Sequence, residues 1–250
     1  MEIKHLEGIR ACVFDAYGTL FDFNGAALAA SDQLGENAPR LSEIWRQKQL
    51  QYTWLRGLAG RHTDFWQVTG DALDYALAAL GIDRPGLRTQ LLDLYLHLDC
   101  YPEVRETLSR LRAAGLKLAI LSNGTPAMLA AVVRHNGLES FLDAVLSVEE
   151  VGVFKPHPAV YGLASDRLQI APTAICFLSS NAWDAYSAKA SGLRVLWCNR
   201  FSQASERIPA TPDGEIQDLS AVPSMLLPAS DSLSDREAVA PDHAVEMSSR

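Results

Sequence analysis

The sequence lacks three features that would point to a partner larger than a small molecule. It contains no run of Lys or Arg residues, and its formal net charge is −8, so we expect neither nucleic acid nor an anionic membrane as the main partner. No segment approaches the ~18 consecutive apolar residues of a membrane helix. The charged start MEIKHLEGIR lacks the apolar stretch of a signal peptide. Together these absences predict a cytoplasmic protein without a membrane partner.

The sequence is also poor in cysteine, with four residues and no CxxC pair. Cys12, Cys176 and Cys198 lie in or beside apolar runs, so we expect buried structural thiols rather than disulfides or metal ligands. Apolar residues make up 48% of the 250 residues and charged residues 21%. These proportions are typical of a globular protein with a substantial core.

Short apolar runs alternate with helical patterns along much of the chain. The run from Ile9 to Phe14 is typical of a buried parallel strand, and later strands are expected at 116–121, 144–147, 174–178 and 194–197. Helices are expected between them, at 104–114, 126–136, 158–168 and 182–191, with a last short one within 218–227. Alternating strands and helices predict an α/β fold with a doubly wound parallel sheet.

The first strand is followed by a block of about 80 residues that shows helical periodicity only. Apolar residues recur at helical spacing from Leu41, with Ser42 as the expected N-cap. Further helices are expected at 73–80 and 87–98. We therefore predict an inserted all-helical cap subdomain at 21–98, a core domain formed by 1–20 and 99–227, and a disordered tail at 228–250.

Polar side chains follow three of the predicted strands, where a purely structural sheet would need none. Because ligands of open α/β sheets bind outside the carboxyl ends of the strands, we expect these groups to share one site. They are Asp15, Tyr17 and Thr19 after the first strand, Ser122 and Asn123 after the second, Ser179, Asn181 and Asp184 after the fourth, and Lys155 before a helix. A carboxylate at a strand end can act as a covalent nucleophile, and a nearby Lys would keep Asp15 ionised.

Four separated motifs carry a family resemblance. FDAYGTLFD (14–22), SNG (122–124), FKPHPAVY (154–161) and SSNAWDAYSAKASG (179–192) resemble the haloacid dehalogenase superfamily. Together with WRQKQLQYTWLRGL (45–58) in the cap, they are most similar to the bacterial (S)- or L-2-haloacid dehalogenases. The resemblance covers nearly all of residues 8–200 in order. It implies a Rossmann-like core, a homodimer, a short-chain L-2-haloacid as substrate, and a D-2-hydroxyacid and a halide ion as products, with no cofactor.

The resemblance also implies a role for each matched position. Asp15 would displace the halogen from C2 with inversion, forming an ester that water then hydrolyses. Ser122 and the backbone N–H groups of Ala16 and Tyr17 would hold the substrate carboxylate, and Thr19 would orient Asp15. The leaving halide would be cradled by Arg46, Asn123 and Trp183. The charge balance around Asp15 and the position of the hydrolytic water would be set by Lys155, Tyr161, Ser179, Asn181 and Asp184. Which of Lys155 and Asp184 activates the water is open. The apolar pocket would be lined by Tyr17, Gln47, Leu50, Phe65 and Trp183.

Two positions separate this chain from the Mg²⁺-dependent phosphatases of the same superfamily. Those enzymes carry DxDxT, whose second Asp protonates the leaving alkoxide, whereas Tyr17 stands there in DAYGT. A phenol with a pKa near ~10 is a poor acid for that task, and a halide needs no proton. Ser180 stands where the phosphatases place a metal-binding Asp. We therefore expect no metal.

Two alternatives remain open besides the dehalogenase: a Mg²⁺-dependent small-molecule phosphatase, and a non-catalytic binding protein on the same scaffold. The intact set of Asp15, Lys155 and Asp184 argues against the second. Taken alone, Asp15 would be a turn residue and Arg46 a solvated side chain; their interpretation as site residues depends on the neighbouring motifs.

Overall fold

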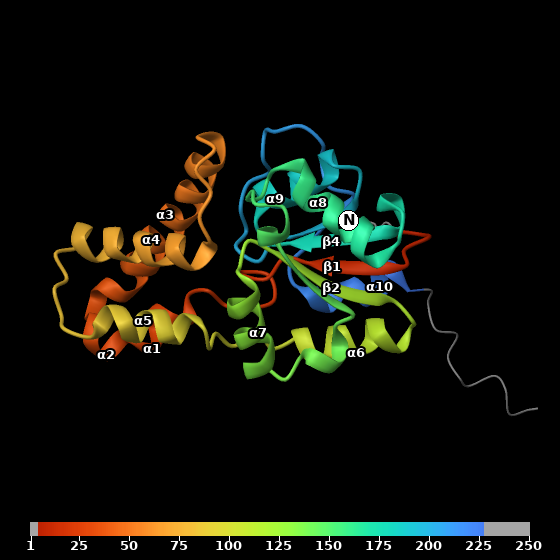
Figure 1. Ribbon diagram of the computed structural model, residues 1–250. Helices are drawn as coiled ribbons and strands as arrows, with labels where there is room; N and C mark the ends of the chain where they lie inside the picture. The colour runs from red at the N-terminus through yellow and green to blue at the C-terminus, as the bar shows by residue number, and fades with distance from the viewer. Residues whose placement is uncertain (1–4, 228–250) are drawn as a thin grey trace, which may run out of the picture.

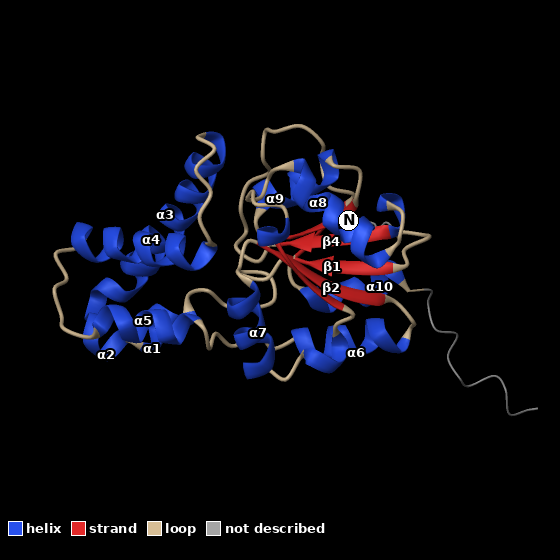
Figure 2. Cartoon of the chain, in the orientation of Figure 1, coloured by secondary structure: helices blue, strands red, loops and turns tan. Residues whose placement is uncertain are grey.

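The computed structural model describes residues 5–227. In that part of the chain, six strands form one parallel sheet in the order β3-β2-β1-β4-β5-β6, and helices cover both of its faces (Figures 1 and 2). Helices α6 and α7 lie on one face and α8 and α9 on the other (Figure 1). This arrangement confirms the predicted doubly wound α/β core. The strands are β1 (Ala11–Phe14), β2 (Lys117–Ser122), β3 (Ala144–Ser147), β4 (Ile175–Ser179), β5 (Arg194–Cys198) and β6 (Gly214–Ile216), and the core helices are α6 (Val104–Ala113), α7 (Pro126–His135), α8 (Pro158–Leu168), α9 (Ala182–Ala190) and α10 (Val222–Leu226).

The central strands are buried, as their unbroken apolar runs predict. All four residues of β1 are buried, because β2 and β4 flank it and helices cover both faces. Phe14 pairs with Ile120 of β2 and Leu178 of β4. This register places Asp15, Ser122 and Ser179 at the same edge of the sheet, where the predicted site was expected.

Five helices lie between β1 and α6 and form the inserted cap (Figure 1). Their core is apolar: Leu41, Trp45, Phe65, Leu73 and Leu91 are all buried. The prediction of an all-helical insert is confirmed, although α1 and α2 and the early start of α4 were not foreseen. The cap helices are α1 (Gly25–Ala29), α2 (Ser31–Leu34), α3 (Ala38–Leu58), α4 (Phe65–Ala79) and α5 (Leu87–Tyr95).

The structure corrects one detail of the sequence prediction and adds two that the prediction lacked. Helix α3 begins at Ala38, so Ser42 is not its N-cap but a buried residue whose hydroxyl donates to Asn24 Oδ1 at 2.7 Å. The N-cap of α4 is Asp64, which accepts a hydrogen bond from the backbone of Gln67. Strand β6 was missed because three residues at a sheet edge carry too short a pattern. The tail expected at 228–250 lies outside the described residues.

The chain crosses between core and cap twice, and the two crossings are paired. The backbone N–H of Asp22 donates to Asp99 O at 3.0 Å, and that of Tyr101 donates to Leu20 O at 3.0 Å. Phe21 and Cys100 form an antiparallel bridge. The cap is therefore attached to the core through a short two-stranded ribbon.

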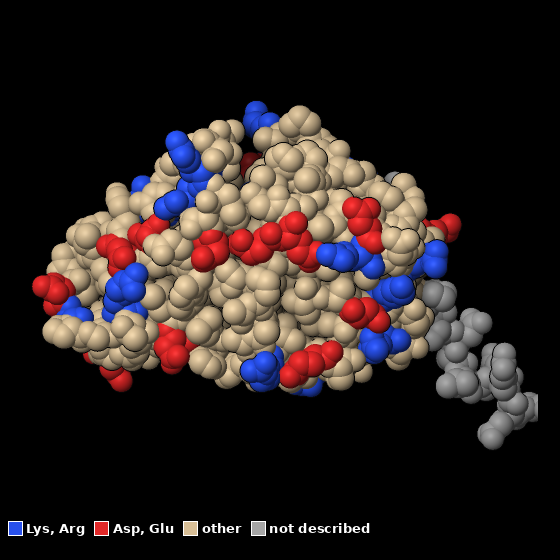
Figure 3. Space-filling view, viewed as in Figure 1, with Lys and Arg blue, Asp and Glu red and all other residues tan. Residues whose placement is uncertain are grey.

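The surface carries both signs of charge. On the face drawn in Figure 3, Lys and Arg side chains are scattered, and Asp and Glu side chains form a row across its middle. This face therefore offers no continuous basic patch for a polyanion. No helix within residues 5–227 combines the length and the apolar character needed to cross a membrane.

Candidate active site

The carboxylate of Asp15 is the centre of a dense hydrogen-bond network. Asp15 follows β1 directly and is 6% exposed. Its Oδ2 accepts hydrogen bonds from Asn181 Nδ2 at 2.8 Å and from Thr19 Oγ1 at 3.1 Å, with Ser179 Oγ at 3.5 Å. Its Oδ1 accepts from Lys155 Nζ at 3.1 Å. These donors fix the orientation of the carboxylate.

Lys155 links Asp15 to a second buried carboxylate. Its ammonium is 3.1 Å from Asp15 Oδ1 and 2.8 Å from Asp184 Oδ2, and the side chain is 1% exposed. Burial lowers the pKa of Lys155, but the two carboxylates outweigh it and raise this pKa above its ordinary value. Burial raises the pKa of Asp184, opposed mainly by Lys155. Tyr161, whose hydroxyl donates to Asp184 Oδ1 at 2.7 Å, completes the network.

The loop after β1 is tied to the loop after β4. The backbone N–H of Ser180, just after β4, donates to Thr19 Oγ1 at 2.8 Å. The same hydroxyl group donates to Asp15 Oδ2. Within residues 5–227, the backbone N–H groups of Ala16 and Tyr17 have no hydrogen-bond acceptor. Unpaired N–H groups beside a strand end are suited to bind an anion.

Ser122 and Asn123 lie on the opposite side of Asp15, after β2. The Ser122 hydroxyl accepts from the N–H of Gly124 at 3.1 Å, which leaves its proton for another partner. The Asn123 side chain accepts from the N–H of Lys155 at 3.0 Å. Asn123 thereby connects the β2 end to the segment that carries the ammonium group.

The cap contributes one cation to the site. Arg46 lies on α3, and its guanidinium donates to Asn181 Oδ1 at 3.1 Å and to Gln49 Oε1 at 2.8 Å. The guanidinium also lies over the ring of Phe23, 5.0 Å from its centroid. Arg46 therefore faces the same Asn181 that holds Asp15, and it adds positive potential to the cavity from the cap side.

Most of the predicted residues line one small, narrow cavity between cap and core. Tyr17 forms part of its apolar wall and stacks on Tyr95, with ring centroids 5.2 Å apart. Thr19, Tyr161, Ser179 and Asp184 lie behind this surface and act through the groups that they contact. The lining residues are Asp15, Tyr17, Arg46, Leu50, Phe65, Ser122, Asn123, Lys155, Asn181 and Trp183.

One predicted pocket residue does not reach the cavity, and two residues were missed. Gln47 is exposed, because it lies on the outer side of α3. Instead Gln49 is buried and accepts from Arg46, and its amide reaches Tyr95 OH at 3.1 Å. The signal for Gln49 was its place three residues after Arg46 on one helix face. Tyr95, which comes from a distant helix, had no such signal.

The donor set does not resemble a divalent-cation site. Both carboxylates of the network are paired with Lys155, and no group of three or more His, Cys, Asp or Glu side chains within residues 5–227 is placed to hold a metal ion. The Ser180 hydroxyl is buried without a partner where a further carboxylate would be needed. Absence of a metal requirement stays a prediction, which a chelator tests.

Comparison with known proteins agrees with this geometry. The model of the haloacid dehalogenase-like hydrolase family matches residues 9–192. (S)-2-haloacid dehalogenase 1 of Pseudomonas sp. strain CBS-3 is 45% identical over 89% of this chain and 98% of its own. (S)-2-haloacid dehalogenase of Pseudomonas sp. strain YL is 44% identical over 87% of this chain and 94% of its own.

A solved structure supports the same relationship. L-2-haloacid dehalogenase from Xanthobacter autotrophicus, with chloropropionic acid covalently bound, superimposes with a TM-score of 0.81 and is 38% identical, covering 87% of this chain and 98% of that one. The fold, the arrangement of polar groups around Asp15 and these similarities lead to one conclusion. The chain belongs to the haloacid dehalogenase-like hydrolase family.

Proposed function

We propose that the protein is an (S)-2-haloacid dehalogenase, which hydrolyses L-2-haloacids to D-2-hydroxyacids through an ester on Asp15. The observation that carries this proposal is the buried Asp15 carboxylate, held by Lys155, Thr19 and Asn181 and facing Arg46 across a small cavity. It is a nucleophile fixed in one orientation beside a cation suited to receive an anionic leaving group.

The substrate carboxylate binds to the Ser122 hydroxyl and to the unpaired N–H groups of Ala16 and Tyr17. An Asp15 oxygen then attacks C2 from the side opposite the halogen. The new C–O bond forms as the C–X bond breaks, the halide leaves with the electron pair, and C2 inverts. Arg46, Asn123 and Trp183 surround the halide.

Ester formation changes the charge balance of the network. Asp15 loses its negative charge, so the ammonium of Lys155 is then opposed by Asp184 alone. Asp184 is still 2.8 Å from the Lys155 ammonium, and it is then the remaining carboxylate of the network. It takes the proton of the attacking water through that ammonium, which lines the cavity. Water adds to the ester carbonyl of Asp15, and the proton taken up by the Lys155–Asp184 pair passes to the departing alkoxide, which leaves as the hydroxyacid. The second proton of the water is lost as the Asp15 carboxylate is regenerated. The overall products are the hydroxyacid, a halide ion and one proton.

Tyr17 supports dehalogenation over phosphate ester hydrolysis. Burial, with Tyr95 and Asp15 nearby, raises the pKa of Tyr17 well above its ordinary value, so it is an even weaker acid than a free phenol. A leaving alkoxide would need a proton from this position, and a halide does not.

The test is halide release from L- and D-2-chloropropanoate with a chelator present. Release from the L enantiomer alone, with D-lactate as product, is expected. Folded protein that releases no halide from the L enantiomer contradicts the proposal, and chelator-sensitive phosphate release would replace it by the phosphatase alternative. Repeated turnover in ¹⁸O-water should also place label in Asp15, since water attacks the ester at its carbonyl carbon.

Two further expectations belong with this function. We propose a homodimer in the cytoplasm, as the resemblance implies. Sedimentation velocity of the purified protein measures the mass of the assembly, and fractionation of the producing cells locates the protein.

A further inference from the structure

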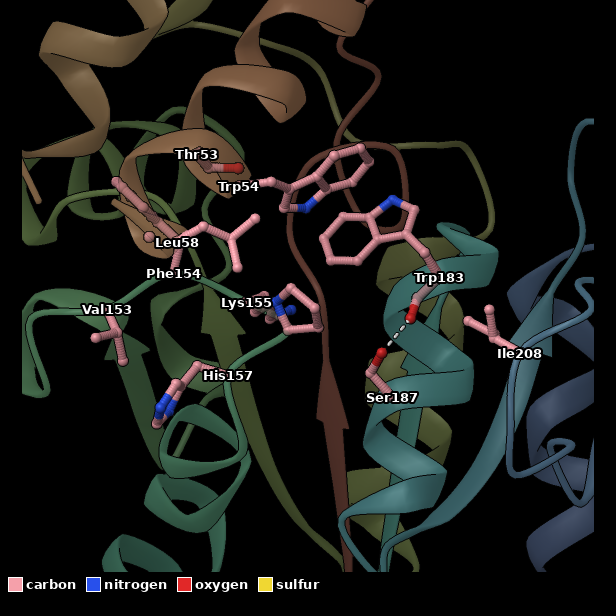
Figure 4. Close-up of a pocket in the computed structure, with 12 residues that line it drawn as sticks. Thr53, Trp54, Leu58, Val153, Phe154, Lys155, His157, Trp183, Ser187 and Ile208 are labelled. Atoms are coloured by element: carbon pink, nitrogen blue, oxygen red, sulfur yellow. Dashed lines mark hydrogen bonds between the residues drawn. The ribbon is translucent and has the colours of Figure 1, made fainter. Parts of the chain in front are cut away.

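A second and larger cavity adjoins the catalytic one. It lies between the C-terminal half of α3, the segment 153–157 and α9 (Figure 4). Its walls are mainly apolar, with Trp54 and Leu58 from the cap, Val153 and Phe154 from the core loop, and Trp183 and Ile208 beyond them. Nothing in the catalytic steps above uses this outer cavity.

The two cavities share a wall. Lys155 and Trp183 line both of them. The ammonium of Lys155 is already paired with two carboxylates, so this residue offers no free charge to the outer cavity. Trp183 meets Trp54 edge to face, with ring centroids 5.4 Å apart and an interplanar angle of 83°. Trp183 therefore stands at the boundary of the two cavities, and Figure 4 shows its indole ring beside that of Trp54.

The inner cavity is much smaller than the outer one. It must hold the substrate carboxylate, C2 and the halogen beside Asp15. A longer substituent on C2 does not fit there as well, and the outer cavity, on the other side of the shared Trp183, is the adjoining apolar space. The carboxylate and C2 of such a substrate are bound beside Asp15, so its tail is kept next to the outer cavity. A separate apolar ligand would have no such anchor.

We propose that the outer cavity binds the apolar tail of 2-haloacids with chains of six or more carbons, and that Trp54 and Leu58 determine this specificity. The inference rests on the proposed dehalogenase function and extends it from short-chain substrates to medium-chain ones. Leu58 forms the outer lip, since its side chain is 88% exposed while it still lines the cavity. Burying the tail between these side chains removes apolar surface from water, which strengthens binding with chain length.

The test compares kcat/KM for the L enantiomers of 2-bromopropanoate, 2-bromohexanoate and 2-bromooctanoate. We expect kcat/KM to rise about two- to fourfold for each methylene that enters the outer cavity, from the transfer free energy of a methylene group. A kcat/KM that stays flat or falls from three carbons to eight, with 2-bromopropanoate turned over normally, overturns the inference and leaves the proposed function standing. Failure to turn over any of the three overturns both.

A pair of variants on α3 locates the effect. Leu58→Glu places a charge at the lip of the outer cavity; Leu55→Glu is the matched control, since Leu55 is 53% exposed on the same helix and is absent from the cavity lining. Leu58→Glu should lower kcat/KM for 2-bromooctanoate about tenfold or more and leave 2-bromopropanoate within about twofold, because an ionised side chain at the lip would have to lose water to cover the apolar tail. Leu55→Glu should change neither.

Two outcomes of this comparison contradict the inference. Equal effects of the two variants on 2-bromooctanoate would show that general surface charge, not the cavity, is responsible. A loss of dimer mass in Leu58→Glu alone, together with no preference for long chains in the unmodified protein, would assign the cavity to a second copy of the chain instead.

Discussion

Replacement of Lys155 by Met tests the buried charge network directly. The change keeps a long unbranched side chain in a site that is 1% exposed, but it removes the cation between Asp15 and Asp184. Breaking a buried ion pair by removing one partner destabilises proteins by about 3–5 kcal/mol, since the remaining charge stays buried and uncompensated. We expect a loss of this size in the free energy of unfolding at pH 7.5.

The same distances predict how the loss depends on pH. Asp15 Oδ1 and Asp184 Oδ2 lie 3.1 and 2.8 Å from the same Nζ, so they are at most about 6 Å apart. Two charges at that distance repel by about 3 kcal/mol at an effective dielectric constant of about 20, which favours protonation of one of the two carboxylates. In Lys155→Met one carboxyl therefore binds a proton more tightly when folded than when unfolded. Stability gained in this way is present at low pH and is lost as the pH rises through the raised pKa.

Urea unfolding at pH 5 and pH 7.5 measures both effects. The deficit of Lys155→Met against the unmodified protein should be smaller at pH 5 by about 1 kcal/mol or more. Lys117→Met is the control, because Lys117 is exposed and its ammonium contacts the carbonyl of Leu168 rather than a carboxylate; its effect should stay within about 0.5 kcal/mol. An equal deficit at the two pH values, or no deficit at all, would refute the reasoning.

Three further predictions concern activity and pH. Asp15→Asn should lower halide release by about 10⁴-fold or more while the protein stays folded by circular dichroism; retained turnover would exclude Asp15 as the nucleophile. Arg46→Lys should lower kcat/KM for 2-chloropropanoate about 10- to 100-fold, since Lys cannot contact Gln49 and Asn181 with a planar fork, and an unchanged value would remove Arg46 from the halide site. Because the pKa of Lys155 is raised, its stabilising contribution should be complete below pH 10.5 and be lost only as the pH rises through the higher folded-state value. Thermal unfolding at pH 8 to 11 checks this, and a loss of stability at pH 9 that is absent from Lys155→Met would contradict it.

The sheet core could be predicted from sequence because its strands are fully buried and bounded by clear signals. The run ACVF ends at Asp15 and AICFL ends beside Ser179, so local pattern was enough to place both ends. Strand β6 was not predicted, for the opposite reason. Gly214–Ile216 gains its strand conformation from pairing with β5, and three residues show no periodicity of their own. The start of α3 was also missed, since Asn37 makes no side-chain cap there.

The site residues that could be predicted are those that follow strands or belong to a recognised motif. Asp15, Thr19, Lys155, Asn181 and Asp184 come together in the structure through parallel strand ends. The cap side was harder, because which face of a long helix meets the core depends on tertiary packing. Gln47 and Gln49 are equally polar and two residues apart, and only the orientation of α3 decides that Gln49 contacts Arg46.

The ribbon that joins cap to core divides the site residues between two parts of the chain. Its paired crossings, Leu20–Asp22 and Asp99–Tyr101, leave the cap one axis about which to swing. Arg46 travels with the cap, whereas Asp15, Lys155 and Asp184 stay with the sheet. A swing of the cap about that axis would open the cavity and part Arg46 from Asn181 in the same movement, so that entry of substrate and loss of the halide cradle would be coupled.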